Sequence, residues 1–285
     1  MKVESKTKFF IITLVSGWLV LLGVVPLLLL IGASFLAHDP MQLVRFEFST
    51  DAYVQLADPV YIKVIWRSLQ LALITTFLCL IIGYPFAWYT ARLSPGWRTA
   101  ALVLLMIPFW TNSLVRTYAI RMVLGTQGIL NKVLLSLGII DAPIRFMYTD
   151  FAVVTGLFYL MLPFMILPLY ASAEKLNFQL VEAARDLGAG ALQTLRKVIL
   201  PLTLPGIVAG CVMVFVPTMG LFYVASLLGG ARQLLIGNLI QQQFLNARNW
   251  PLGSATSVLL IFVMAVMLGG YGLLVRRMSQ RERRK

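Results

Sequence analysis

Long apolar segments alternate with short polar ones along this chain. Six segments contain no charged residue: Phe9–Ala37, Ser68–Ala91, Thr99–Val115, Phe151–Ala173, Val198–Ala231 and Asn249–Val275. A helix needs about 20 apolar residues to cross a bilayer, and the third segment reaches that length if its helix continues past Arg116. Unpaired backbone amides are excluded from hydrocarbon, and the segments do not alternate as barrel strands do. The pattern therefore predicts an all-α polytopic membrane protein with six transmembrane helices.

The composition agrees with this pattern. Hydrophobic residues make up 59% of the chain and charged residues 12%, which excludes an ordinary soluble domain. We expect a single transmembrane domain over residues 1–285. The first apolar segment is about twice as long as the apolar core of a signal peptide and contains Trp18 and Pro26, so we interpret it as a retained helix.

The basic residues predict an orientation. With six spans both termini share a side, and 15 of the 24 Lys and Arg residues fall on it. The positive-inside rule then places both termini in the cytoplasm. We expect the basic tail after Val275 to lie on anionic lipid headgroups. A nucleic-acid partner is not expected, since the chain has no other surface that would bind one.

Residues with reactive or metal-binding side chains are few. Cys79 and Cys211 lie inside predicted spans without metal-ligand neighbours, so we interpret them as packing residues. His38, the single histidine, stands at an outer helix end. We expect no metal, no cofactor and no catalytic residues. Two outer stretches, 129–135 and 234–245, are amphipathic and either cover a pore mouth or pack at the interface.

A polar segment, residues 174–197, separates the fourth and fifth spans. Asn177 can cap a helix over Phe178–Leu187, and Gly188 is a natural stop for it. Glu182 shares one helix face with Arg185 or Asp186, and Leu180, Ala184 and Leu187 share another. A second short helix is expected over about Ala191–Val198, ending before Pro201 and Pro205. We therefore predict two short helices along the cytoplasmic membrane surface, which offer a contact to another protein.

This polar segment, together with the start of the fifth span, resembles the EAA loop of bacterial ABC importer permeases. The resemblance rests on Glu182-Ala183-Ala184, Gly188 and Leu200-Pro201, at the family's spacing. From about Trp18 to Tyr271 the chain is also similar to the B-type permease subunits of spermidine/putrescine importers. That likeness is carried by Gly83–Trp88, Pro108–Tyr118, Leu162–Tyr170 and Gly220–Tyr223.

The resemblance implies a fold and a set of partners. The fold would be the type I importer permease fold (MetI-like), in the bacterial inner membrane, with the coupling loop at about 174–203. Partners would be a second, C-type permease subunit, two copies of a cytoplasmic ATPase, and a periplasmic polyamine-binding protein. The chain has no G-x-x-x-x-G-K-[ST] phosphate loop, so ATP would be bound by the ATPase subunits. The residues expected to couple to the ATPase are Glu182, Ala183, Ala184, Asp186, Gly188 and Pro201.

A polyamine path needs aromatic faces and oxygen atoms, because ammonium groups bind to both. The candidate path residues are Trp110, Asn112, Tyr118, Asp150, Tyr159, Phe222 and Tyr223. In one respect the chain departs from the related permeases: it has Ser226 where they often carry an acid.

Two alternatives remain open at this point. The first is the same architecture importing another small solute. The second is a self-contained secondary carrier or an intramembrane enzyme. A carrier would show inverted halves and buried ionisable groups, and an enzyme would show a catalytic cluster at membrane depth; neither is evident in the sequence.

Overall fold

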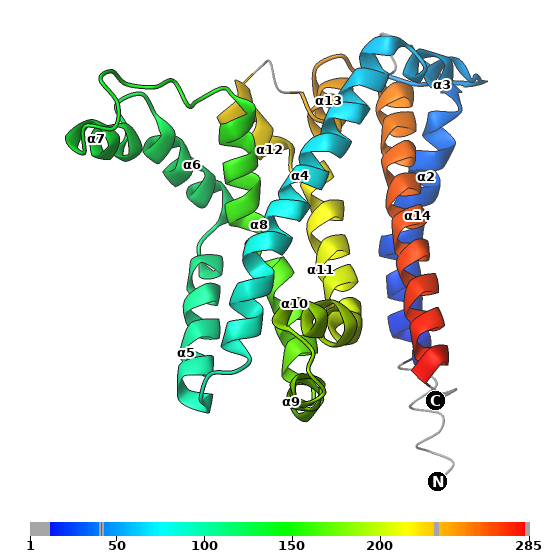
Figure 1. Cartoon of the computed structure of the whole chain (residues 1–285). Helices are drawn as coiled ribbons and strands as arrows, with labels where there is room; N and C mark the ends of the chain where they lie inside the picture. The colour runs from blue at the N-terminus through cyan, green and yellow to red at the C-terminus, as the bar shows by residue number, and fades with distance from the viewer. Residues whose placement is uncertain (1–11, 40, 42, 231–233, 283–285) are drawn as a thin grey trace. The chain divides into compact units, whose positions relative to one another are not determined.

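The computed structural model describes residues 12–39, 41, 43–230 and 234–282, and its regular structure is almost entirely helical (Figure 1). Within these residues, the helices long and apolar enough to cross a membrane are Ile12–Ser34, Pro59–Thr90, Asp150–Glu174, Ala191–Gly220 and Trp250–Gly270. A sixth span results if the bent pair Pro95–Trp110 and Ser113–Ser136 counts as one. The predicted all-α membrane fold is confirmed, with a break in the third span.

The chain divides into two compact units. The first comprises Met1–Lys63 and Leu239–Val263, and the second comprises Val64–Asn238 and Met264–Lys285. Helices α4 (Pro59–Thr90), α13 (Ile236–Leu245) and α14 (Trp250–Glu282) contribute residues to both units. The assignment of residues 1–285 to one permease domain stays a prediction.

The first unit begins with a transmembrane helix. Its elements are a π-helical turn η1 (Val20–Val24), α2 (Val25–Ser34), β1 (Leu36–Ala37), β2 (Arg45–Phe48) and α3 (Asp51–Leu56). The two strands pair antiparallel. Ala52 and Leu56 of α3 form a buried cluster with Leu252 and Ala255 of α14, so this cluster unites residues from distant parts of the sequence.

The second unit contains the remaining helices. They are α5 (Pro95–Met106), the 3-10 turn η2 (Ile107–Trp110), α6 (Ser113–Leu124), α7 (Ile129–Ser136), α8 (Asp150–Glu174), α9 (Gln179–Asp186), α10 (Ala191–Thr194), the π-helical turn η3 (Leu195–Ile199), α11 (Leu200–Gly220), α12 (Phe222–Val224) and the π-helical turn η4 (Ala225–Gly229). Much of its buried core comes from α8, including Leu157, Met165 and Leu169.

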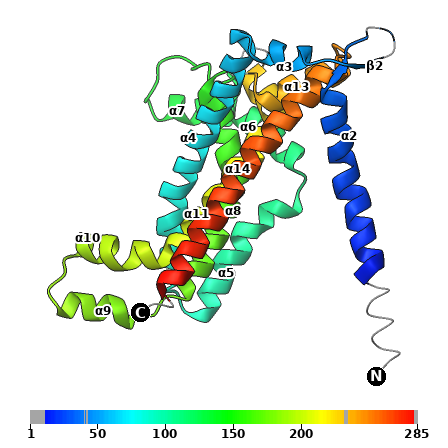
Figure 2. The same ribbon diagram turned by 90° about the vertical axis from the view of Figure 1, so that its right-hand side faces the viewer.

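Helices α8 and α11 lie side by side, and glycine permits their close approach (Figures 1 and 2). A Cβ atom added at Gly206 of α11 would stand 2.6 Å from the carbonyl oxygen of Pro168 in α8. A Cβ at Gly210 would stand 2.7 Å from Sδ of Met165. Small residues at such positions are typical of membrane helix interfaces, where close packing drives association.

The third span breaks where a continuous helix was predicted. Helix α5 continues into η2 and stops at Trp110, and the helix that begins at Ser113 is inclined by 93° to it. Thr111 is extended, and the side chain of Asn112 accepts a hydrogen bond from Leu114 N at 2.8 Å, which caps α6. The expectation that this helix continues past Arg116 is therefore wrong, because Asn112 starts a new helix.

The expected end of the second short helix before Pro201 is also wrong. Residues Ala191–Gly220 are helical throughout, and Pro201 falls in the first turn of α11. The π-helical turn η3 ends directly before it, so the missing proline N–H falls where the hydrogen-bonding pattern already changes. Figure 2 shows α10 running across the direction of α11, and the wide turn accommodates that change of direction.

Both amphipathic outer stretches contain helices, α7 and α13. The buried Asn131 ties α7 to the loop that follows it. Its amide nitrogen donates to Ile144 O, and its amide oxygen accepts from Ile144 N, each at 2.9 Å. Whether either helix covers a pore mouth stays a prediction.

Candidate coupling helix and transport path

Helix α9 has defined ends on both sides. The side chain of Asn177 accepts a hydrogen bond from Gln179 N at 3.0 Å, so this residue serves as the predicted cap. At the other end Gly188 N donates to Arg185 O at 2.9 Å, and Ala189 N donates to Ala184 O at 3.0 Å. This pair of bonds is the Schellman motif, which satisfies carbonyls that the helix end would otherwise leave unpaired.

Gly188 has a backbone conformation that favours glycine. Its φ is +83°, in the left-handed region, which costs other L-residues about 1–2 kcal/mol. A Cβ atom at this position would meet nothing within 4 Å. The requirement for glycine is therefore conformational, and the predicted helix stop is confirmed.

One face of α9 is anchored to the helical bundle. Val181 is buried together with Leu176 and Ile199, and Phe178 and Trp88 pack against this cluster. The Phe178 and Trp88 ring centroids lie 5.7 Å apart. Because Trp88 belongs to α4 and Ile199 to η3, α9 packs directly against two neighbouring helical segments.

The opposite face of α9 is open to solvent in this chain. Glu182, Ala183 and Asp186 are exposed, as predicted for a contact with another protein. Leu187 is 89% exposed, and Leu180 is also exposed. An exposed apolar surface beside charged residues is typical of an interaction site. Pro201 lies apart from this surface, at the start of α11.

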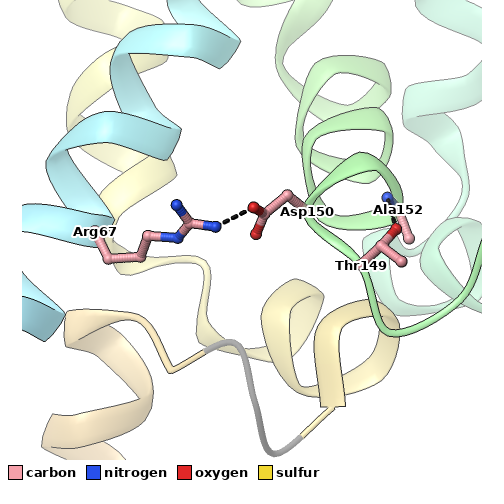
Figure 3. Close-up of polar contacts among 4 residues, drawn as sticks. All are labelled: Arg67, Thr149, Asp150 and Ala152. Atoms are coloured by element: carbon pink, nitrogen blue, oxygen red, sulfur yellow. Dashed lines mark hydrogen bonds and ion pairs between the residues drawn. The ribbon is translucent and has the colours of Figure 1, made fainter.

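Asp150 lies at the first turn of α8 and forms an ion pair with Arg67 of α4 (Figure 3). The Arg67 guanidinium donates to one carboxylate oxygen of Asp150. The two side chains are 39% and 46% exposed, so the pair is within reach of solvent. The partner of Asp150 could not be predicted, since Arg67 is 83 residues away and nothing local marks the pairing.

Two hydrogen bonds fix the backbone near this ion pair. Tyr148 N donates to Leu228 O at 2.8 Å, which joins the loop before α8 to η4. Ile236 N donates to the Ser68 hydroxyl at 2.8 Å, which joins α4 to the start of α13. The loop before α8 is thus fixed to η4, and α4 is fixed to the start of α13.

The candidate aromatic residues occupy three different places. Trp110 stands at the break of the third span and is 83% exposed, and the half-exposed Tyr118 follows on α6. Tyr159 lies on α8, and Phe222 and Tyr223 follow α11. Among the described residues, the ring contacts of these candidates are confined to Phe222 with Tyr223, whose centroids are 6.1 Å apart. The structure therefore does not gather the candidates into one aromatic cluster.

Ser226 belongs to a polar cluster that sequence reasoning missed. The buried Asn238 donates to the Ser226 hydroxyl at 2.6 Å and to Phe222 O at 3.0 Å. Its amide oxygen accepts from Leu235 N at 3.2 Å. Asn238 thereby provides hydrogen-bond partners for backbone groups near α12 and η4, where regular helix is interrupted. Such groups would be destabilising if they were left unpaired in hydrocarbon.

The sequence of this chain matches that of a known family. The sequence pattern of binding-protein-dependent transport system inner membrane components matches residues 72–280. The chain belongs to this family. The permease is thus a multi-pass inner membrane protein of a transport system that depends on a binding protein, as the EAA-like loop indicated. That membership favours the importer permease over the self-contained carrier and the intramembrane enzyme.

Relatives of the permease are similar over nearly its whole length. The spermidine/putrescine transport system permease protein PotB of Salmonella typhimurium (strain SL1344) is 54% identical over 94% of this chain and 93% of its own. PotB of Escherichia coli (strain K12) is 55% identical over 90% and 94%. The predicted resemblance is confirmed.

Solved structures support the fold. A chain of a bacterial ABC transporter that imports the acidic polysaccharide alginate superposes with a TM-score of 0.78, at 17% identity over 96% of both chains. A chain of the MetNI methionine ABC transporter superposes with a TM-score of 0.57, at 18% identity over 78% of this chain and 99% of its own. These similarities confirm the predicted importer permease fold.

Proposed function

We propose that this chain is a permease subunit of an ABC importer that takes up spermidine and putrescine. One observation carries the proposal: the 54–55% identity to PotB proteins extends over 90–94% of the chain. Identity at this level over both the transmembrane spans and the loops supports a shared substrate class. The chain forms part of the substrate path and transmits movement of the ATPase to it, and ATP is hydrolysed on separate subunits.

The complete transporter contains a second, C-type permease subunit, two copies of a cytoplasmic ATPase and a periplasmic polyamine-binding protein. The binding protein delivers substrate to the outer ends of α4 and α8. Both termini and α9 lie in the cytoplasm, in agreement with the distribution of basic residues.

The exposed face of α9 is the coupling contact. Glu182 and Asp186 provide carboxylates for basic or amide groups of the ATPase, and Ala183 and Ala184 permit its close approach. Since Phe178 and Val181 anchor α9 next to Trp88, movement of the ATPase is passed on to α4. Pro201 contributes indirectly, because it lies in α11 beyond the wide turn that joins α11 to α10.

The substrate path uses aromatic faces and one carboxylate of this chain. Trp110, Tyr118, Tyr159, Phe222 and Tyr223 provide rings, each worth about 0.5–2 kcal/mol to an ammonium group.

The two other path candidates, Asn112 and Asp150, already have a hydrogen-bond or ion-pair partner within the chain, which limits what they offer to a substrate. Asn112 contributes its remaining amide donors, because its oxygen caps α6. Asp150 is neutralised by Arg67, so a substrate amine must replace the guanidinium in order to bind there. With Ser226 in the place of an acid, further carboxylates for a polycation come from the C-type subunit.

Uptake tests the proposal directly. The importer is expressed in cells that lack their own polyamine importers, and labelled spermidine and putrescine are supplied with and without this subunit. An ATPase variant that cannot hydrolyse ATP serves as the control. We expect uptake that requires both this subunit and ATP hydrolysis. If the complete complex assembles but transports neither polyamine, the proposal is wrong. The same assay is then repeated with other small solutes, and uptake of one of them identifies the alternative cargo.

A further inference from the structure

A groove of about 500 Å³ lies between the turn that joins α4 to α5 and the anchored side of α9. Its walls are formed by Ala91, Arg92, Arg98, Phe178, Val181, Glu182 and Arg185. Three guanidinium groups therefore face one carboxylate, and the groove has an excess of positive charge. Of the groove residues, Glu182 is also assigned to the coupling contact, whereas the three arginines are not. That contact therefore leaves their excess positive charge unexplained.

The positive charge is only partly neutralised within the chain. Arg98 donates to Glu174 at 2.7 Å, but its Nε is buried without a hydrogen-bond partner among the described residues. Within the same residues, no carboxylate lies within ion-pair distance of Arg92 or Arg185. Burial and, after it, the charge of Arg185 lower the pKa of Arg92, which stays protonated at neutral pH. An anion in the groove would relieve this repulsion.

Arg92 is held in an orientation suited to binding an anion. Its guanidinium carbon lies 4.3 Å from the centroid of the Trp88 ring and 5.2 Å from that of Phe178. Both rings lie within cation–π distance of the guanidinium, a contact that does not use its N–H donors. Arg92 makes no side-chain hydrogen bond with the described part of the chain. The group is therefore positioned while its donors remain available.

The groove lies at the depth of lipid headgroups. Arg92 follows shortly after Thr90, the last residue of the α4 span, and α5 begins at Pro95. Tyr89 and Trp97 flank this turn and are largely exposed. Tyrosine and tryptophan are enriched at the membrane–water interface, so their positions mark the headgroup level. Basic pockets between helix ends on the cytoplasmic side bind anionic headgroups.

We propose that this groove binds the phosphate headgroup of an anionic phospholipid of the cytoplasmic leaflet, through Arg92 and Arg185. The phosphate oxygens accept hydrogen bonds from both guanidinium groups, so one lipid bridges the α4–α5 turn and α9. The acyl chains lie along the exposed apolar surface beside Tyr89 and Trp97. The bridge stiffens the support of the coupling helix, and the rate of coupled ATP hydrolysis rises with the anionic lipid content. The proposal rests on the cytoplasmic placement given above and not on the identity of the substrate.

The test uses the complete transporter complex in lipid nanodiscs made of phosphatidylcholine with increasing shares of phosphatidylglycerol. Native mass spectrometry measures retained lipid, and ATPase activity is measured with loaded binding protein. In wild type we expect retention of phosphatidylglycerol and activity that increases with its share. Arg92→Gln should need about fivefold more phosphatidylglycerol for half of the full effect, since one basic residue near a membrane surface contributes about 1 kcal/mol. Arg92→Lys, which keeps the charge, should need much less than this.

The control is Arg196→Gln, which removes an exposed basic residue of η3 outside the groove and should leave the lipid dependence unchanged. Equal lipid dependence of wild type and Arg92→Gln overturns the proposal. So does full activation of phosphatidylcholine nanodiscs by inorganic phosphate, which identifies a site for free phosphate. A loss of affinity for the ATPase in Arg92→Gln that is as large in pure phosphatidylcholine as in phosphatidylglycerol also overturns the proposal, because the groove is then an ATPase contact. Lipid retention is measured without substrate, so it remains readable if the importer carries a different solute.

Discussion

Replacement of Gly188 separates the geometry of the coupling helix from its packing. The residue has φ +83°, and a Cβ atom there would meet nothing within 4 Å. Alanine therefore adds no clash and costs only the left-handed conformation, about 1–2 kcal/mol. Asparagine adopts this conformation more readily, and valine adopts it least readily. We expect the effect of substitution to increase in the order asparagine, alanine, valine.

The magnitude follows from the cost of the left-handed conformation that the Schellman motif requires. If the end of α9 must be formed before the ATPase binds, a cost of about 1–2 kcal/mol lowers the ratio of formed to unformed ends about 5- to 30-fold. The affinity of the purified permease pair for the ATPase should fall by up to the same factor in Gly188→Ala. Polyamine uptake should fall with it, while the amount of permease in the membrane stays close to that of wild type. Gly188→Glu adds a negative charge near Asp186 and should uncouple transport further.

Titration of the ATPase against the detergent-purified permease pair measures this affinity, and vesicle uptake measures the coupling. Gly190→Ala is the matched control, because Gly190 has φ −65° and an open position for Cβ, and it should bind the ATPase like wild type. Equal affinities for wild type, Gly188→Asn and Gly188→Ala would refute the reasoning, since the left-handed conformation would then be irrelevant to docking.

Three other substitutions test separate parts of the structure. Arg67→Gln should lower the spermidine concentration for half-maximal ATPase stimulation by about two- to fivefold, and Asp150→Asn should raise it by a similar factor, because a half-exposed ion pair contributes up to about 1 kcal/mol. Changes in the same direction for both variants would contradict competition between Arg67 and the substrate for the carboxylate. Asn238→Ala leaves buried polar groups unpaired at about 1–3 kcal/mol each, so the yield of monodisperse protein should fall, and a normal yield counts against this role. Gly206→Ala places a methyl group against a backbone oxygen of α8, so the thermal midpoint should fall by several degrees; an unchanged midpoint is the opposing result.

Local signals predicted the features that depend on a few neighbouring residues. The apolar segments located the membrane spans, and Asn177 and Gly188 marked the ends of α9 because capping is a local interaction. Asn112 followed by Ser113 is a similar capping signal, but the apolar sequence around it favoured a continuous helix. The predicted helix end before Pro201 is wrong, since the π-helical turn before it has no sequence signature.

Long-range pairings escaped prediction for a different reason. Arg67 with Asp150 and Asn238 with Ser226 are set by how helices pack, and no sequence spacing records that. The same is true of Arg92, whose position over Trp88 and Phe178 requires the end of α4 to lie beside the start of α9. Sequence analysis could name Asp150 and Ser226 as residues of interest but could not identify the groups that neutralise or bind them.

Cross-linking from an exposed position on α9 tests the central claim, that this cytoplasmic helix is the contact for the ATPase. Ala183→Cys introduces an exposed thiol, while the native Cys79 is buried and Cys211 is partly buried, so the parent chain is the background control. A cross-linker that cannot cross the membrane, with a maleimide at one end and a photoreactive diazirine at the other, is added to inside-out vesicles that contain the whole transporter and is then activated by light. We predict an adduct between this 31.8 kDa chain and the ATPase, accompanied by loss of ATP-driven spermidine transport. Labelling of the introduced thiol only from the periplasmic face, or undiminished transport after the cross-link has formed, would contradict the account.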